Sequence, residues 1–144
     1  MHKIKFLLQA VPLLLIIFII TVNHGLKYFI DPLALLYVLI FSLSLFSYSE
    51  GKAGLRALYR IIFKGNNRKA IKKDILIKML NNLISYIYIA GVTGLIVGQI
   101  MLLNLYPLSK FSTQRHIADS LLALLYSIII NELLIRPIKN SIKN

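Results

Sequence analysis

Two long apolar segments near the C-terminal end constrain the fold of this chain more than any other feature. They read LISYIYIAGVTGLIVGQIMLLNL over residues 83–105 and IADSLLALLYSIIINELLI over residues 117–135. A helix needs about 20 apolar residues to cross a hydrocarbon core about 30 Å thick, and each segment is close to that length. Because only a short connection joins them, we expect an antiparallel pair of membrane-spanning helices.

The first of these segments carries a stripe of glycines. Gly91, Gly94 and Gly98 fall on one side of a helix that turns by about 100° per residue, and Gly94 with Gly98 forms a GxxxG pair. A helix side without side chains lets the backbone of a neighbouring helix approach closely. We therefore predict that these glycines are helix-packing residues.

The second segment carries a polar stripe. Ser120, Ser127 and Asn131 share one face of the helix. Inside hydrocarbon such a face must be turned toward protein or toward a hydrated path. Together with Thr93 of the preceding segment, these residues are our candidates for an ion path. The alternative, that they only help helices to pack, stays open.

The composition excludes a soluble domain of this size. Hydrophobic residues make up 58% of the 144 residues, and the mean hydropathy is +0.74. The formal net charge is +12, but the charges lie between apolar runs, which favours anionic lipid over nucleic acid as their partner. The chain has no cysteine, and therefore no disulfide and no thiolate metal site.

The apolar pattern predicts one all-α membrane domain over residues 1–144, with four crossings at about 6–22, 32–48, 83–105 and 117–135. The N-terminal segment resembles a signal peptide in outline. The TVNHGLK sequence that follows it has no small-x-small cleavage site, so we expect the segment to remain as the first crossing.

A basic segment over residues 50–82 separates the second crossing from the third. Its pattern predicts one amphipathic helix, a turn at 65–67 and a second amphipathic helix over 68–80. Cations that recur every four residues form what we call the basic ridge: Lys52, Arg56, Arg60 and Lys64. We expect this segment to lie on the cytoplasmic lipid surface, and the alternative is a docking surface for an acidic soluble protein.

Positive charge also predicts the topology. Residues 1–5, 50–82 and 136–144 are basic, whereas the loops at 23–30 and 106–116 carry few charges. Because short basic loops stay in the cytoplasm, both termini are expected on the cytoplasmic side of a bacterial inner membrane.

Nothing in the sequence indicates an enzyme. It contains no HExxH motif, no phosphate-binding loop and no cluster of histidines or carboxylates, so we expect neither a bound metal nor a cofactor. Asp119 and Glu132 lie about 20 Å apart along one helix, which is too far for joint acid–base chemistry. Arg136 follows Glu132 by one helical turn, so a structural ion pair is expected there.

Three stretches resemble the MotA/TolQ/ExbB superfamily of membrane proteins. NHGLKYFIDPLALLYVLIFSLSLF is similar to the second transmembrane region of the flagellar stator protein MotA, and AGVTGLIVGQIMLLNL is similar to the third. IADSLLALLYSIIINELLIRPIKNSI is similar to the fourth helix of that family. The residues of this stretch that match the family pattern are Leu121, Leu122, Leu125, Tyr126, Pro137 and Ile138.

The resemblance implies a MotA-like four-helix stator subunit with a shortened cytoplasmic region. It implies a homopentamer whose third and fourth helices line a pore around two copies of a single-helix partner similar to MotB or ExbD. In that family protons or sodium ions pass through the complex, and the carboxylate that takes up the ion belongs to the partner.

The chain departs from the family pattern in the fourth helix. The paired threonines of the family correspond to Ala123 and Leu124, and the glycine after the tyrosine corresponds to Ser127. The main alternative is therefore a non-conducting oligomeric membrane scaffold. A small four-helix antiporter is a further alternative, but such proteins usually need a glutamate within the first helix, and residues 6–22 contain none.

Overall fold

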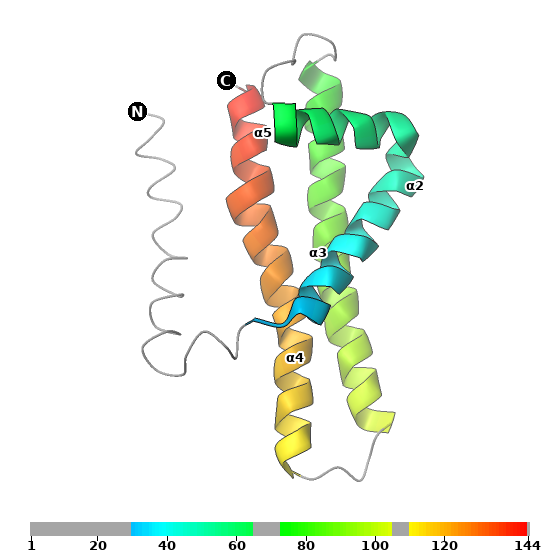
Figure 1. Ribbon diagram of the computed structural model, residues 1–144, viewed down its shortest axis with the longest axis vertical. Helices are drawn as coiled ribbons and strands as arrows, with labels where there is room; N and C mark the ends of the chain where they lie inside the picture. The colour runs from blue at the N-terminus through cyan, green and yellow to red at the C-terminus, as the bar shows by residue number, and fades with distance from the viewer. Residues whose placement is uncertain (1–29, 65–72, 105–109, 144) are drawn as a thin grey trace, which may run out of the picture. The chain divides into compact units, whose positions relative to one another are not determined.

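The computed structural model describes residues 30–64, 73–104 and 110–143, and all regular structure in these ranges is helical. The chain divides into two compact units, Met1–Pro32 and Leu33–Asn144. The second unit holds the helices described below, apart from the first residue of α2 (Figure 1). The predicted first crossing and the predicted turn at 65–67 lie outside the described residues.

Three helices are long and apolar enough to cross a membrane: Pro32–Ile62, Lys73–Asn104 and Ile117–Ile142. They overlap the second, third and fourth predicted crossings and are longer than predicted. The prediction of an all-helical protein is therefore confirmed for the described part of the chain, with three helices of the length and composition that a membrane crossing needs. The first crossing and the orientation in the membrane stay predictions.

Helix α2 (Pro32–Lys64) changes direction at Gly51, where φ is 64° and ψ is −167°. Glycine adopts this positive φ at little steric cost because it has no Cβ. The bend separates an apolar first half from a basic second half, which runs across one end of α3 (Lys73–Asn104) in Figure 1. The sequence places the boundary at the same point, because the second crossing ends near residue 48 and the basic segment begins at residue 50.

Helix α3 is continuous over its 32 residues. This differs from the expected break between an amphipathic helix over 68–80 and a crossing that begins at 83. The stretch KDILIKMLNNLISY contains neither glycine nor proline, so nothing in its backbone interrupts the helix. Its amphipathic part and its membrane-spanning part therefore form one rod.

Helix α4 (Lys110–Ile129), the π-helix η3 (Ile130–Ile135) and helix α5 (Arg136–Lys143) follow one another without a loop. The helical path extends beyond the predicted end at residue 135. Pro137 has no N–H to donate to the carbonyl of Leu133, and its ring crowds that carbonyl. The wider π register accommodates this, and the Arg136 N–H donates to the Asn131 carbonyl five residues before it.

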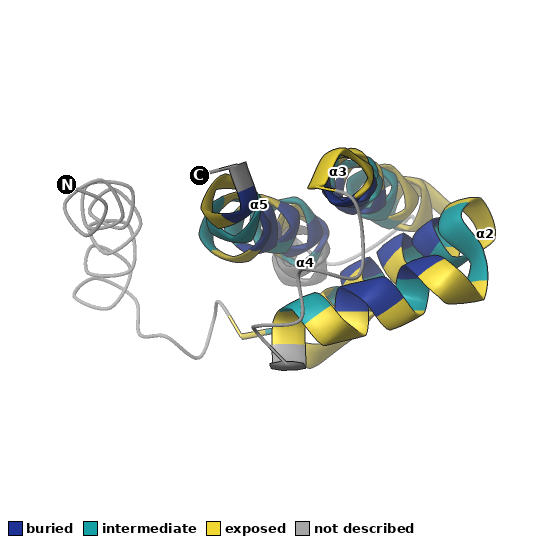
Figure 2. Ribbon diagram, turned by 90° about the horizontal axis from the view of Figure 1, so that it is seen from above, coloured by how far each residue is buried: buried dark blue, intermediate teal, exposed yellow. Residues whose placement is uncertain are grey.

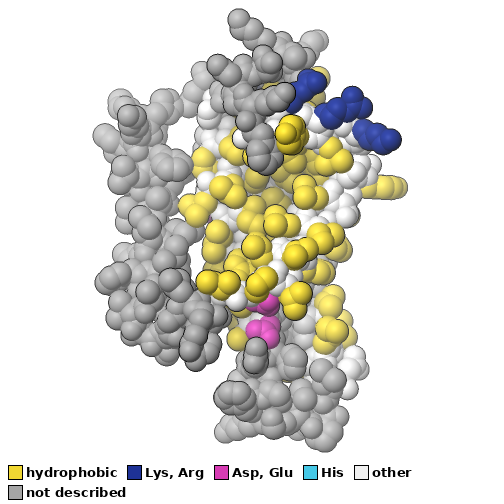
Figure 3. Space-filling model, viewed as in Figure 1, with side chains coloured by type: hydrophobic (Ala, Val, Ile, Leu, Met, Phe, Trp, Pro, Cys, Tyr) yellow, Lys and Arg dark blue, Asp and Glu magenta, His cyan; other side chains and the backbone are white. Residues whose placement is uncertain are grey.

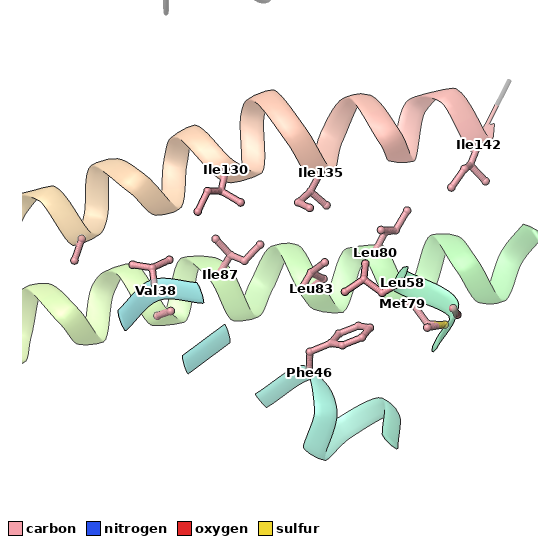
Figure 4. Packing of buried hydrophobic residues seen from close by; sticks show 13 residues of the cluster. Val38, Phe46, Leu58, Met79, Leu80, Leu83, Ile87, Ile130, Ile135 and Ile142 are labelled. Atoms are coloured by element: carbon pink, nitrogen blue, oxygen red, sulfur yellow. The ribbon is translucent and has the colours of Figure 1, made fainter. Parts of the chain in front are cut away.

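The core lies where α2, α3 and the η3–α5 region meet. Figure 4 shows Val38 and Phe46 of α2 directed at α3, and Ile130, Ile135 and Ile142 directed at α3 from the other side. Burial therefore follows the inner faces of the helices, as Figure 2 shows. The largest of the fully buried apolar side chains are Phe46, Leu80 and Val38.

Large apolar side chains also cover the outer surface of this unit (Figure 3). On α3 they lie opposite the glycine stripe, at Ile89, Val92, Ile96 and Ile100, each 45–51% exposed. A soluble protein rarely exposes so continuous an apolar surface. Hydrocarbon removes the cost of exposing it, which agrees with a membrane protein.

Candidate functional site

The glycine stripe of α3 and the polar stripe of α4 face each other within one chain. Gly98 lies against Ser120, and a Cβ built at Gly94 would lie 2.8 Å from the Ala123 Cβ. A Cβ built at Gly91 would lie 2.6 Å from the Ser127 Cβ. Real Cβ atoms do not approach so closely, so the two helices pack nearly backbone to backbone.

The two serines of the polar stripe use their hydroxyl groups inside this interface. Ser127 is fully buried and its Oγ donates to the Leu124 carbonyl at 2.7 Å. Ser120 is 5% exposed, and its Oγ donates to the Ile117 carbonyl at 2.8 Å. The Gln99 amide of α3 donates to the same Ser120 Oγ at 2.7 Å. Both hydroxyls are thus satisfied within the helix pair.

Asn131 lies in the π-helix and is fully buried. Its Nδ2 donates to the Ile84 carbonyl of α3 at 3.1 Å. Its Oδ1 is buried and has no hydrogen-bond partner among the described residues. The amide nitrogen of this side chain therefore links the π-helix to α3. The amide oxygen makes no hydrogen bond, and an unpaired acceptor in a low-dielectric interior destabilises the fold.

Thr93 lies on a different side of α3 from the glycine stripe. Tyr37 of α2 donates its hydroxyl to the Thr93 Oγ1 at 3.2 Å. The Thr93 Oγ1 in turn lies 2.9 Å from the Ile89 carbonyl and 3.0 Å from the Ala90 carbonyl, within its own helix. The structure thus groups Thr93 with α2 and not with the stripe of Ser120, Ser127 and Asn131.

Glu132 pairs with Arg136 at 2.9 Å, so the predicted ion pair is confirmed. Its second carboxylate oxygen accepts a hydrogen bond from the Tyr88 hydroxyl of α3 at 2.9 Å. Sequence analysis did not find Tyr88, because a tyrosine in an apolar helix carries no signal of its partner. Glu132 therefore joins α3 to the π-helix through Tyr88, and it joins two successive helical turns through Arg136.

Two adjacent asparagines on α3 hold the basic end of this unit together. Asn82 donates to Glu50, the residue before the Gly51 bend, at 2.7 Å. Asn81 accepts a hydrogen bond from Lys139 of α5 at 3.0 Å. Sequence reasoning did not single out this pair, which lies in the basic segment just before the apolar part of α3. These contacts fix α2 and α5 at the same level of α3.

The basic ridge lies on the second half of α2. Lys52, Arg56 and Arg60 are exposed, while Lys64 ends the helix and its side chain lies outside the described set. The described residues contain no group of histidines and carboxylates that could hold a metal ion.

The structure brings the predicted packing residues and two of the predicted ion-path residues into one buried interface. In a single chain, Ser120 and Ser127 are directed at the α3 glycines. Their assignment to an ion path stays a prediction. Comparison of the chain with protein-family models, with curated proteins and with solved structures gave no match. The resemblance to the MotA/TolQ/ExbB superfamily therefore stays an expectation from the sequence.

Proposed function

We propose that this chain is the ring-forming subunit of an ion-driven membrane complex of the MotA/TolQ/ExbB kind. In this proposal five copies surround two copies of a single-helix partner, and protons or sodium ions pass between ring and partner. The complex lies in a bacterial inner membrane with both chain termini in the cytoplasm.

The observation that supports this proposal best is the close packing of α3 on α4, the two helices that line the pore in the resembled superfamily. Gly91, Gly94 and Gly98 allow these two helices to pack closely enough to form one layer of a ring. The opposite side of α3 presents Ile89, Val92, Ile96 and Ile100. In a single chain this side would face hydrocarbon, and in the proposed ring it faces the apolar helices of the partner instead.

The test of assembly is the mass of the protein in mild detergent or lipid nanodiscs. We expect a particle with five times the 16.4 kDa chain mass. Ion passage is then measured with a pH-sensitive dye inside vesicles that hold this chain together with the product of its neighbouring gene. A stable monomer at native-like lipid content contradicts the ring.

A second candidate function is a non-conducting membrane scaffold. It is favoured by the burial of Ser120, Ser127 and Asn131 within one chain, which leaves the exposed stripe of α3 apolar. Ser127→Ala separates the two candidates, because it removes the hydroxyl without adding bulk against Gly91. Reduced ion flux in an intact pentamer supports the ion path, and a pentamer that carries no flux in the wild type supports the scaffold.

A further inference from the structure

The second half of α2, residues 52–64, lies at the edge of the membrane-spanning region. Residues 83–104 of α3 extend about 33 Å at 1.5 Å per residue, close to the about 30 Å of a hydrocarbon core. Asn82 stands just outside this stretch, and its hydrogen bond to Glu50 brings the α2 bend to the same level. The helix that follows Gly51 then runs across the end of α3 and not along it (Figure 1).

One side of this half-helix is anchored to the rest of the protein. Gly54, Ala57 and Leu58 are buried, and a Cβ built at Gly54 would lie 3.4 Å from the Met79 Cε of α3. Leu58 and Met79 belong to the same core cluster and lie near each other in Figure 4. The depth and the rotation of the half-helix are therefore set by α3.

The remaining sides divide into an apolar edge and a basic edge. At about 100° per residue, the partly exposed Leu55 and the exposed Tyr59 and Ile62 fall on one edge. Lys52, Arg56 and Arg60 fall on the other, and basic side chains gather along this half-helix in Figure 3. A helix in the membrane plane needs this arrangement, with an apolar edge toward acyl chains and cations toward headgroups.

We propose that the second half of α2 binds the headgroups of anionic phospholipids. Lys52, Arg56 and Arg60 supply the charge, and arginine guanidinium groups can donate two parallel hydrogen bonds to one phosphate. The level of the Glu50–Asn82 contact selects a lipid over an acidic soluble protein as the occupant, because it puts Tyr59 and Ile62 where acyl chains begin. This surface is independent of the α3–α4 interface and of any ion path.

The chain contains no tryptophan, so Tyr59→Trp introduces a single tryptophan at an exposed site of the apolar edge. The full-length variant is reconstituted in vesicles of phosphatidylcholine with 30% phosphatidylglycerol as a probe composition, and either lipid is brominated near the headgroup to quench tryptophan. We expect brominated phosphatidylglycerol to quench on the order of twofold more per molecule than brominated phosphatidylcholine. The excess should fall at high salt, because salt screens exposed charges.

Two further variants separate charge from folding. Lys52→Gln, Arg56→Gln and Arg60→Gln in the Tyr59→Trp background should abolish the preference and leave quenching by brominated phosphatidylcholine unchanged. The matched control exchanges the same residues as Lys52→Arg, Arg56→Lys and Arg60→Lys, and it should keep the preference. Equal quenching by both lipids in the parent variant overturns the recognition of anionic headgroups. Absence of quenching by either lipid overturns the placement of the helix on the bilayer and leaves a soluble acidic partner as the occupant.

Discussion

Replacement of Gly91 by alanine is the sharpest test of the α3–α4 interface. The added methyl group would lie 2.6 Å from the Ser127 Cβ and 3.3 Å from the Ala123 carbonyl oxygen. The second atom is backbone and Ser127 is fully buried, so the helices must move apart to admit the methyl group. Overpacking of this kind costs about 1–3 kcal/mol, and each 1.4 kcal/mol changes the folded-to-unfolded ratio about tenfold.

The assay is unfolding of the purified chain in mixed micelles by increasing SDS, followed by far-ultraviolet circular dichroism. Gly91→Ala should lower the free energy of unfolding, and Val92→Ala, at the adjacent exposed position, should change it by less than about 0.5 kcal/mol. Replacement of Ser127 by glycine removes the shortest contacts of the added methyl group and leaves the one with the Ala123 carbonyl at 3.3 Å. The double variant should therefore cost less than the two single changes together, with a coupling energy of about 0.5–3 kcal/mol.

The reasoning fails if Gly91→Ala is as stable as the wild type. It also fails if the double variant costs as much as the sum of the single variants, because the clash with Ser127 would then not be the cause of the loss.

Three further predictions concern other parts of the fold. Gly51→Ala should destabilise by about 1–3 kcal/mol through backbone strain alone, since no atom lies within 4 Å of the added Cβ and only glycine adopts this combination of φ and ψ readily. An unchanged midpoint in the same SDS assay would contradict the positive φ. Asn131→Leu removes both the bond to the Ile84 carbonyl and the buried acceptor without a partner, so it should cost no more than about 1 kcal/mol. Asn131→Asp loses the donor and keeps buried acceptors, so it should be more destabilising, and the reverse order of thermal midpoints would mean that Oδ1 is satisfied. Arg60→Cys in this cysteine-free chain should react with an impermeant maleimide only from the cytoplasmic side, and labelling from outside alone would refute the predicted topology.

Residue spacing was sufficient to locate three long apolar helices, although it did not predict the continuity of α3 or the extension of the last helix beyond residue 135. Apolar length located three helices that are long enough to cross a membrane. The rotation of about 100° per residue placed Gly91, Gly94 and Gly98 on one side of α3. The change from apolar to basic sequence around Glu50 marked the bend in α2. These features depend on one segment at a time, so a single sequence contains them.

Contacts between segments could not be predicted in the same way. Periodicity defined a glycine face and a polar face, but it could not show that Gly98 meets Ser120 in the same chain. That pairing depends on the length of the connection and on the register of two helices. The bond from Tyr37 to Thr93 was missed for the same reason, as was the one from Tyr88 to Glu132.

The π-helix also had no sequence signal beyond Pro137, which lies two residues after the predicted end of the fourth crossing. The helix continues, because a local widening of the turn removes the crowding at less cost than a break in a long apolar helix. Prediction from helix propensity assumes that proline ends a helix, and it does not consider a local π-helical turn that lets the helix continue.

The widened turn over Ile130–Ile135 also sets the phase of everything that follows it. An extra residue in one turn shifts the later side chains by about 100° relative to an uninterrupted α-helix. With that offset, α5 presents Lys139 to Asn81 and buries Ile142. A deletion of one residue in this turn would therefore leave α4 seated on α3 while rotating α5 away from it. Insertions and deletions in this turn would therefore change the rotation of α5 at the basic end of the protein without any change in the composition of α4 or α5.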